Sequence, residues 1–398
     1  MQSRYDVIIV GAGPAGACAG YAAASAGLNV LILERRKLPR YKTCGGGIPV
    51  SVGDLLPDID PALFCESTVT HLRHTWKFAD AYLGELNPNP DEKTMSLWMV
   101  QRSAFDEYLT NRAIAAGSVV HDSTFVRTIE RSANGKVTVT TENGDSFAAD
   151  FIIGADGAVG RVSRAGGLRK DRQLAIALEA EIPHAWGNGS PHLQAHIGHL
   201  EYGVPRGYAW IFPKANHLSI GAGYFGRRSA SNRGEAKKKD LADWINGYLR
   251  SMQLPEADQS IEFHGHPLPI WNGSEEIQAW DGRLILAGDA AGMVNPLFGD
   301  GISYACRTGK RAAESIIQGT SAHWTKTVAA EFGTDMDAAL DIAKYFYQLS
   351  KLCYKLGVKH PRGTRLAGRL IAGDLKFSEI KDRLPWKNTA SNTNQTAW

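Results

Sequence analysis

The sequence predicts an α/β protein with three parts, and three observations support this prediction. Gly-rich turns follow short apolar strands at three widely separated places, beginning at Gly11, Gly154 and Gly288. Residues 175–225 show a succession of strand patterns separated by turns. Beyond residue 321, apolar residues recur at helical spacing. We therefore expect a Rossmann-like α/β domain, an antiparallel-sheet domain and a helical C-terminal segment.

The first Gly-rich turn has the surroundings that a dinucleotide-binding motif requires. Apolar residues 7–10 lead into Gly11-Ala12-Gly13-Pro14-Ala15-Gly16, and a helix of small residues and a second apolar strand follow. In such a unit Gly11 permits the tight turn, Gly13 lets the backbone approach a pyrophosphate, and Gly16 lets helix and strand pack closely. Unpaired N–H groups at the helix N-terminus attract the phosphates.

Glu34 stands at the end of the second apolar strand of this unit. It follows Gly16 by 18 residues, a position from which a carboxylate can accept hydrogen bonds from both hydroxyls of a ribose. Residues 5–35 therefore predict nucleotide binding. The alternative is a Gly-rich turn that serves packing alone.

Length, composition and charge place wider limits on the class of protein. The 398 residues suffice for two or three domains, and 43% hydrophobic with 21% charged residues is typical of a globular protein. A net charge of +3 gives no sign of a nucleic-acid partner. The five cysteines form no CxxC pair, which argues against a disulfide framework. Without a signal peptide or a spanning apolar run, a cytoplasmic protein is expected, with peripheral membrane contact left open.

Local signals predict the individual helices and strands. Residues 102–116 form an amphipathic helix with Ser103 as its N-cap. Asn-Gly between residues 137–141 and 146–149 is typical of a hairpin turn. Further strands are expected at residues 151–153, 177–182, 193–198, 207–212, 218–224 and 283–287, and further helices at 237–253 and 301–318.

The second and third Gly-rich turns each carry an aspartate close after an apolar strand, Asp156 in Gly-Ala-Asp-Gly and Asp289 in Gly-Asp-Ala-Ala-Gly. An aspartate beside such a turn suits hydrogen bonding to a ribityl chain. The helix N-terminus near residues 299–301 would direct its dipole at a flavin ring and stabilise the anionic reduced form. A turn-capping role is the alternative for both aspartates.

With these three elements the chain resembles the flavoprotein family that includes aromatic-ring hydroxylases and geranylgeranyl reductases, over roughly residues 5–320. The resemblance implies an FAD-binding domain made of residues 1–70, 98–170 and 281–320. Residues 71–97 and 171–280 would form a substrate-binding domain, and residues 321–398 a helical C-terminal region with a disordered tail. The residues that it implies for cofactor binding are Gly11, Gly13, Ala15, Gly16, Glu34, Arg35, Cys44, Gly45, Arg102, Asp156, Asp289, Gly299, Gly301 and Ile302.

A second signal separates the branches of this family. Residues 205–213 match the PxxYxWxFP pattern that is typical of geranylgeranyl reductases, and the Cys-Gly-Gly-Gly loop at residues 44–47 is similar to a loop of the same enzymes. In a strand Tyr208, Trp210 and Phe212 share one face, so their rings would form one wall. Such a wall beside a flavin suits a long hydrocarbon substrate. Packing of a sheet against a core is the alternative.

The resemblance implies an FAD-dependent reductase that saturates C=C bonds of a geranylgeranyl or other prenyl group by hydride transfer from reduced flavin. NAD(P)H or reduced ferredoxin would supply the electrons. Cys44, Tyr208 and Trp210 are the candidate catalytic residues, and Cys44 and Tyr208 are alternative proton sources. An FAD-dependent monooxygenase that hydroxylates an aromatic or lipophilic small molecule is the alternative in the same fold, and a flavin-binding protein without turnover is a third.

Two further features leave alternatives open. Cys44 can serve packing, act as a redox-sensitive thiol or relay a proton near the flavin. From residue 344 onward, 11 Lys and Arg stand against 3 Asp and Glu, and lysines recur at helical spacing beside aromatic residues. Such a segment either lies on an anionic membrane surface or packs with a solvated basic face.

His264 and His266 lack a third ligand at metal spacing, so no metal site is predicted.

Overall fold

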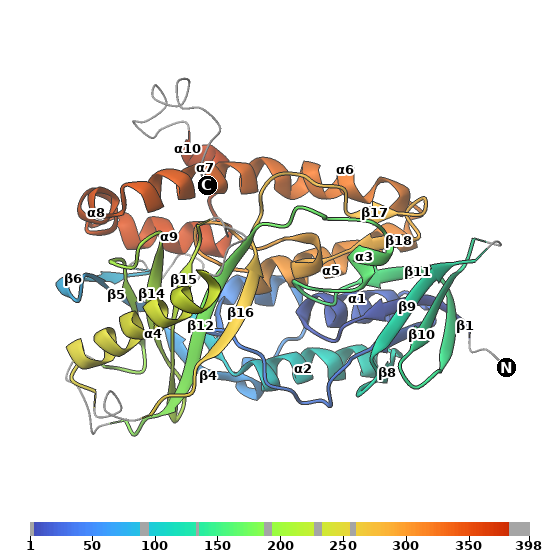
Figure 1. The fold of residues 1–398 in the computed structure, drawn as a ribbon, viewed down its shortest axis with the longest axis horizontal. Helices are drawn as coiled ribbons and strands as arrows, with labels where there is room; N and C mark the ends of the chain where they lie inside the picture. The colour runs from blue at the N-terminus through green and yellow to red at the C-terminus, as the bar shows by residue number, and fades with distance from the viewer. Residues whose placement is uncertain are drawn as a thin grey trace.

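The computed structural model describes residues 4–87, 95–132, 135–186, 193–226, 233–254 and 260–381. Within these residues the chain forms three β-sheets with helices packed against them (Figure 1). The predicted α/β class, with parallel and antiparallel parts and a helical C-terminal segment, is confirmed.

The first sheet has a parallel centre in the order β18-β11-β1-β2-β8. Its apolar strands are buried on both faces, as parallel sheets require. A hairpin of β9 and β10 extends it antiparallel to β11, and β17 pairs with β18 at the edge. The bounds are β1 Arg4–Val10, β2 Val30–Leu33, β8 Val119–His121, β9 Val126–Arg131, β10 Val137–Thr141, β11 Ser146–Gly154, β17 Gln278–Ala279 and β18 Leu284–Leu286.

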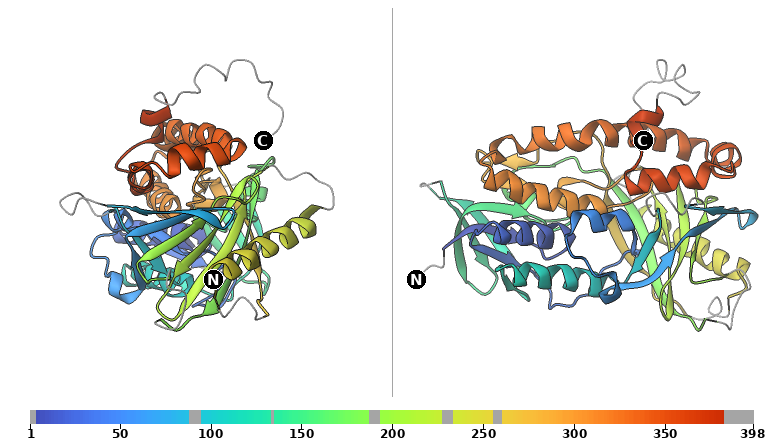
Figure 2. Two further views of the ribbon diagram at one scale, coloured as in Figure 1. Left: turned by 90° about the vertical axis from the view of Figure 1, so that its left-hand side faces the viewer. Right: turned by 180° about the vertical axis from the view of Figure 1, so that it is seen from behind.

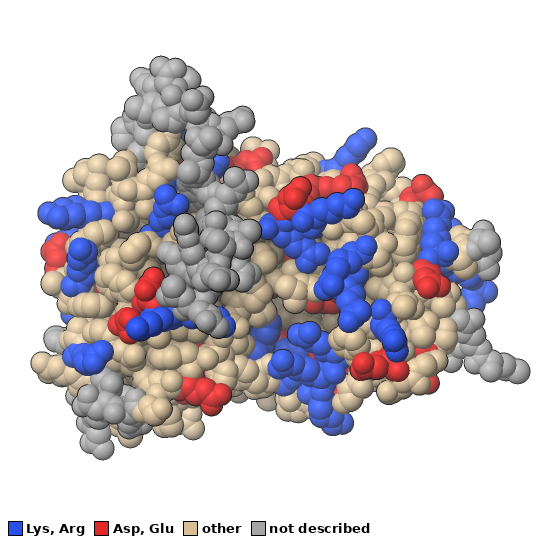
Figure 3. Space-filling model, viewed as in Figure 1, with Lys and Arg blue, Asp and Glu red and all other residues tan. Residues whose placement is uncertain are grey.

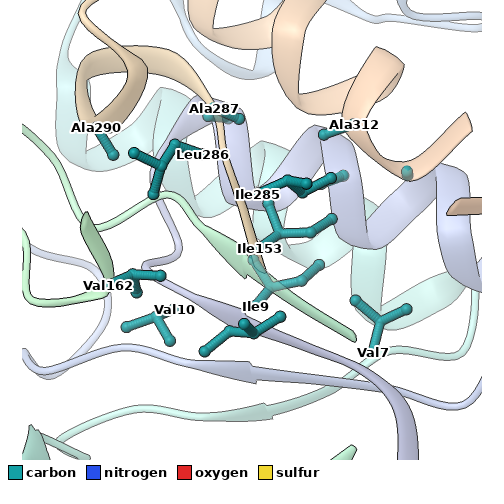
Figure 4. Packing of buried hydrophobic residues seen from close by; sticks show 14 of the residues in the cluster. Val7, Ile9, Val10, Ile153, Val162, Ile285, Leu286, Ala287, Ala290 and Ala312 are labelled. Atoms are coloured by element: carbon teal, nitrogen blue, oxygen red, sulfur yellow. The ribbon is translucent and has the colours of Figure 1, made fainter. Parts of the chain in front are cut away.

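Three helices pack along this sheet: α1 (Pro14–Ser25), α2 (Arg102–Ala115) and α5 (Ile302–Ile317). Figure 2 shows them side by side in its right-hand view. Helix α1 starts directly after β1, with Pro14 in its first turn, where the fixed φ of proline suits a helix start. Figure 4 shows the core beneath these helices, in which Ile9, Ile153 and Ile285 of three adjacent strands pack together.

The second sheet has seven strands in the order β16-β12-β15-β14-β13-β5-β6, antiparallel except between β13 and β5. Helix α4 (Arg233–Ser251) packs on one face, and the C-terminal helices contact the other. The strands are β5 His71–Trp76, β6 Ala79–Glu85, β12 Leu174–Pro183, β13 Ile197–Glu201, β14 Gly207–Pro213, β15 His217–Tyr224 and β16 His264–Pro269.

A small third sheet holds the end of the loop of residues 40–47, since its first strand begins at Gly47. Its order is β3-β7-β4, all antiparallel, with bounds Gly47–Pro49, Leu97–Val100 and Cys65–Val69. Short helical turns complete this part of the chain and the remaining connections: η1 Val50–Leu55, η2 Pro61–Leu63, α3 Val162–Ala165, η4 Gly288–Ala291 and η5 Ser321–His323.

The C-terminal helices form a layer that runs along the top of Figure 1, from the parallel sheet to the seven-stranded sheet. They are α6 Trp324–Val328, η6 Ala329–Gly333, α7 Thr334–Gln348, α8 Ser350–Cys353, η7 Tyr354–Val358, α9 Gly363–Ala372 and α10 Phe377–Lys381. Among the described residues, no helix is long and apolar enough to cross a membrane. The predicted disordered tail falls in residues 382–398, outside the described part of the chain.

Most predicted elements are present within a few residues, and three expectations were wrong in detail. Ser103 is not an N-cap, because Gln101 holds that position and its side chain makes no capping hydrogen bond. The strand expected at residues 193–198 is β13, Ile197–Glu201. Residues 151–153 do not form a separate strand. They belong to the end of β11, whose residues 146–149 pair with β10 and whose residues 148–154 pair with β1. The domain limits stay a prediction.

Candidate active site

A cavity of about 1050 Å³ runs from the carboxyl ends of the central parallel strands to the inner side of helices α7 to α9. Small-molecule sites are typically about 300–1,000 Å³, so this space accommodates a large ligand or two ligands in line. Every residue predicted to bind cofactor or substrate lines the cavity except Gly16. The carboxyl ends of parallel strands are where such folds bind ligands.

The Gly-rich turn after β1 has three glycines with different surroundings. Gly11 has φ +102°, and a Cβ there would lie 2.3 Å from the carbonyl oxygen of Ala155. A Cβ on Gly16 would lie 1.9 Å from the carbonyl oxygen of Gly11. Gly13 differs, because its nearest neighbour would be Nη2 of Arg40 at 3.5 Å. Gly11 and Gly16 are therefore required by packing, whereas a Cβ on Gly13 would make only an ordinary contact with the end of the Arg40 side chain.

Glu34 is buried at the end of β2, with both carboxylate oxygens held in place. One oxygen accepts a hydrogen bond from the backbone N–H of Ala12 at 3.0 Å, and the other accepts one from Arg36 at 3.0 Å. Nε of Arg40 lies 3.4 Å from the same carboxylate. The side chain is thus fixed at the wall of the cavity, with Arg35 beside it in the lining.

A buried chain of charges continues from Glu34 toward the centre of the cavity. Arg102 donates to Asp106 through Nε at 2.8 Å and Nη2 at 2.9 Å, one turn further along α2. Nη1 of Arg40 lies 3.0 Å from the same carboxylate. Arg40 thus bridges Glu34 and Asp106, so the four side chains balance in charge and place two guanidinium groups in the cavity wall as donors for an anionic ligand. Sequence reasoning predicted Arg102 and missed the other two residues, although Asp106 stands at helical spacing from it.

Asp156, in the second Gly-rich turn, uses one carboxylate oxygen as a cap. That oxygen accepts hydrogen bonds from the backbone N–H groups of Arg161 and Val162, the latter at 3.0 Å. The other oxygen, Oδ1, is buried and has no hydrogen-bond partner among the described residues. Burial raises the pKa of this carboxyl. The capping alternative therefore accounts for one carboxylate oxygen, whereas the other is buried beside Gly160 without a donor among the described residues.

Asp289, in the third Gly-rich turn, lines the cavity close enough to Lys42 and Arg102 to interact with their charges. Burial raises its pKa, and the charges of Lys42 and Arg102 oppose that rise. Nζ of Lys42 lies 2.6 Å from Nε2 of His266, and burial lowers the pKa of Lys42 to about 8 and that of His266 to about 3. His266 is therefore a neutral acceptor for the ammonium. Neither His266 nor its pairing was expected from sequence.

Tyr208, Trp210 and Phe212 form one continuous aromatic surface on β14, as predicted from strand alternation. The ring centroids are 6.1 Å apart for the first pair and 6.3 Å apart for the second. The hydroxyl of Tyr208 donates to the carbonyl of Phe298 at 2.6 Å. This bond joins the aromatic wall to the loop that leads through Gly299 into helix α5. It therefore fixes the position of that loop relative to the wall.

The loop of residues 44–47 presses against the same wall. A Cβ on Gly45 would lie 2.9 Å from Nε1 of Trp210 and 3.1 Å from the ring of Phe212. The backbone N–H of Gly46 donates to Sγ of Cys44 at 3.4 Å, and the Arg102 guanidinium is close enough to interact electrostatically with this side chain. Cys44 thus lies between a cation and the aromatic wall, with its side chain in the cavity lining.

Glu179 is the functional candidate that sequence reasoning missed. It lies buried on β12 and accepts hydrogen bonds from the backbone N–H of Cys44 at 2.9 Å and from the hydroxyl of Tyr41 at 3.1 Å. Burial is the largest cause that raises the pKa of Glu179 to about 7, and the charge of the neighbouring Glu181 raises it further. Two glutamates at alternate positions of an otherwise apolar strand were the available signal.

The chain matches the family described as FAD binding domain over residues 4–317. It is 32% identical over 326 residues to geranylgeranyl diphosphate reductase of Rhodobacter capsulatus, covering 79% of this chain and 75% of the relative. It is 31% identical over 366 residues to digeranylgeranylglycerophospholipid reductase 1 of Methanopyrus kandleri, covering 87% and 92%.

Two solved structures share the fold. A geranylgeranyl bacteriochlorophyll reductase-like protein from Thermoplasma acidophilum aligns with TM-score 0.76 at 21% identity, covering 96% of this chain and 100% of that one. The flavin-dependent brominase Bmp2 aligns with TM-score 0.73 at 20% identity, covering 96% and 98%. At these sequence identities the two structures support the fold alone.

Proposed function

Since the chain belongs to the geranylgeranyl reductase family of FAD-dependent oxidoreductases, we propose that it reduces C=C bonds in the hydrocarbon chain of a prenyl compound. NAD(P)H or reduced ferredoxin would supply the electrons. The observation that carries this proposal is the cavity itself, because its lining changes from polar and charged at the strand ends to aromatic and aliphatic beneath the C-terminal helices.

The polar end of the cavity suits FAD. A Cβ on Gly13 would meet only the end of the Arg40 side chain at ordinary contact distance, and a Cβ on Gly157 would meet nothing within 4 Å. Oδ1 of Asp156 is a buried acceptor that still lacks a donor among the described residues, and a ribityl or ribose hydroxyl would satisfy it. Arg35, Arg40 and the N-terminus of α1 would face the pyrophosphate.

The apolar end suits a long hydrocarbon. The wall of Tyr208, Trp210 and Phe212 continues into aliphatic and aromatic side chains from the sheet and from the helices above it. A pocket of this kind excludes water and holds an alkene by shape rather than by hydrogen bonds. The residues beyond the aromatic wall include Leu72, Leu97, Leu200, Ile342, Phe346, Leu370 and Ile371.

Reduced FAD, when bound, supplies a hydride to one carbon of the double bond. The chain must then place a proton on the other carbon, so that two C–H bonds form and the π bond is lost. We assign this proton to the thiol of Cys44, whose S–H bond breaks as the new C–H bond forms. The resulting thiolate would be stabilised by the Arg102 guanidinium, and solvent would later return the proton.

Tyr208 is the less suitable proton source. Its hydroxyl proton is engaged by the Phe298 carbonyl, and burial raises the pKa of the phenol far above its usual value. Its role in the proposal is to hold the alkene against the flavin together with Trp210. Glu179 acts on the same loop through the backbone N–H of Cys44, and is a positioning residue.

The proposal is tested by reducing the holoprotein without oxygen and adding geranylgeranyl diphosphate. Flavin absorbance should return as the substrate gains two hydrogens for each bond reduced. Flavin that stays reduced until oxygen is admitted, with oxygen then found in the product, would instead indicate a monooxygenase. Separate reduction trials with NADPH, NADH and reduced ferredoxin would identify the electron donor.

A further inference from the structure

The apolar end of the cavity opens at the protein surface among four exposed leucines. Leu349 directly precedes helix α8, Leu352 lies on α8, Leu356 lies on η7 and Leu366 lies on α9. Their exposed fractions are 51%, 52%, 69% and 38%, and all four line the cavity. We call these four residues the leucine cluster. Large apolar side chains grouped at a cavity mouth mark an interaction site more often than singly scattered ones do.

The helices that carry the leucine cluster are anchored from beneath. The ring of Tyr354 is fully buried, and its hydroxyl donates to the carbonyl of His74 at 3.3 Å and to that of Asp80. The hydroxyl of Thr364, buried under α9, lies 2.9 Å from Nε2 of His74. The leucines are therefore held outward by fixed backbone, and their exposure does not come from a loose end of the chain.

Basic side chains surround the leucine cluster. Residues 349–373 contain six Lys and Arg and no Asp or Glu. Lys351, Lys355, Arg362 and Arg369 are exposed. Figure 3, viewed as Figure 1, shows Lys and Arg side chains spread over the left-hand end of the molecule, where Figure 1 places α8. An apolar centre with a basic surround is complementary to an anionic lipid surface, in which acyl chains lie below phosphate groups.

We propose that the leucine cluster docks on an anionic lipid bilayer and that the cavity mouth there admits a prenyl chain directly from the membrane. The leucines would enter the boundary between headgroups and acyl chains, and the lysines and arginines would meet lipid phosphates. The route of the substrate rests on the proposed function, whereas the docking itself does not. Lys359 is paired with Asp80, but the exposed Lys351, Lys355, Arg362 and Arg369 keep the surround of the leucine cluster basic, which favours an anionic lipid surface over a second copy of this chain.

The test uses the holoprotein and vesicles of phosphatidylcholine with or without phosphatidylglycerol, separated by sedimentation. We expect binding to the anionic vesicles and much weaker binding to the neutral ones. Replacing the four leucines by Ser should weaken binding about 100-fold or more. Leu63→Ser is the matched control, because Leu63 is 65% exposed on η2 and does not line the cavity.

The charged surround is tested separately. Lys351→Gln and Lys355→Gln should each weaken binding to anionic vesicles about fivefold. Lys326→Gln on α6, also an exposed lysine, should have no such effect. Hydrogen exchange should slow at residues 349–366 when anionic vesicles are added, and stay unchanged at residues 61–66. This second measurement uses the unaltered protein, so it does not depend on how a variant folds.

Three results would overturn the docking proposal. The first is that the wild-type protein stays in solution when anionic vesicles sediment. The second is that the leucine variant sediments with the vesicles as the wild type does. The third is that the leucine variant loses only self-association. Reduction of dissolved geranylgeranyl diphosphate without vesicles reports on the proposed function alone. Lys351→Gln and Lys355→Gln, which do not line the cavity, should keep the wild-type rate there, so the two proposals can fail independently.

Discussion

The carboxylate of Glu179 on β12 accepts a hydrogen bond from the backbone N–H of Cys44 at 2.9 Å, although 135 residues separate them. This bond ties the Gly-rich loop to the seven-stranded sheet and sets the thiol beside the aromatic wall. Tyr41 donates to the same carboxylate at 3.1 Å. The geometry of the proposed proton donor thus depends on a buried acid that belongs to another sheet.

Cys44→Ala should lower the rate of anaerobic flavin reoxidation by prenyl substrate about 10²–10⁴-fold, because a positioned acid contributes that much. FAD content should not change. Cys65→Ala is the matched control, since Cys65 is half-buried on β4 and outside the cavity lining. Single-turnover kinetics measures the rate, and near-normal turnover in the Cys44 variant would remove it from the chemistry.

Tyr208→Phe should keep the rate within about tenfold of wild type, because the proton is assigned to Cys44. The variant loses the hydrogen bond to the Phe298 carbonyl, which costs about 1 kcal/mol of unfolding free energy. The same single-turnover assay decides between the two candidates. A hundredfold loss here, with Cys44→Ala nearly unaffected, would transfer the role to Tyr208.

Gly13→Ala and Gly16→Ala should separate cofactor binding from folding. The Cβ added at Gly16 meets the Gly11 carbonyl at 1.9 Å, so unfolding free energy should fall by about 3 kcal/mol or more. The Cβ added at Gly13 has ordinary contact distance to Arg40, so the apoprotein should stay folded while FAD affinity falls about tenfold or more. Urea unfolding and titration of apoprotein with FAD measure the two effects. Normal FAD affinity in Gly13→Ala would contradict the assigned pyrophosphate site.

Glu179 should make the stability of the apoprotein depend on pH. Its pKa is raised from 4.5 to about 7 in the folded state, so the folded protein holds an extra proton between these values. Stability is then greatest at or below about pH 4.5 for this group and falls as pH rises through 7, by about 3 kcal/mol. Urea unfolding between pH 5 and 8 measures the slope.

Glu179→Gln should remove that slope, while the exposed Glu130→Gln should retain it. Equal slopes in wild type and Glu179→Gln would show that the buried acid is ionised across the range. Because Glu179 acts on Cys44 only through the loop backbone, the Gln variant should also keep most of its activity.

Some of the site follows from sequence because it depends on neighbours in the chain. Gly11, Gly13 and Glu34 stand at spacings set by one strand–turn–helix–strand unit. Tyr208, Trp210 and Phe212 share a face because side chains alternate in any strand. In both cases local backbone geometry decides the arrangement, so a pattern of residue types is enough to predict it.

The remaining residues depend on contacts between distant parts of the chain. Lys42 meets His266 across 224 positions, and Cys44 meets Glu179 across 135. The leucine cluster likewise becomes recognisable only when α8 and α9 are placed over the cavity mouth. Spacing carries no information about such pairs, because the packing of one sheet on another brings them together.

The most direct test of the proposed function is the mass of the product formed under isotopically labelled oxygen. A prenyl substrate, the reduced holoprotein and labelled oxygen are incubated together, and the extracted lipid is examined by mass spectrometry. The account predicts a gain of two hydrogens for each bond reduced and no labelled oxygen in the product. Incorporation of labelled oxygen into the product, with the double bonds intact, would contradict it.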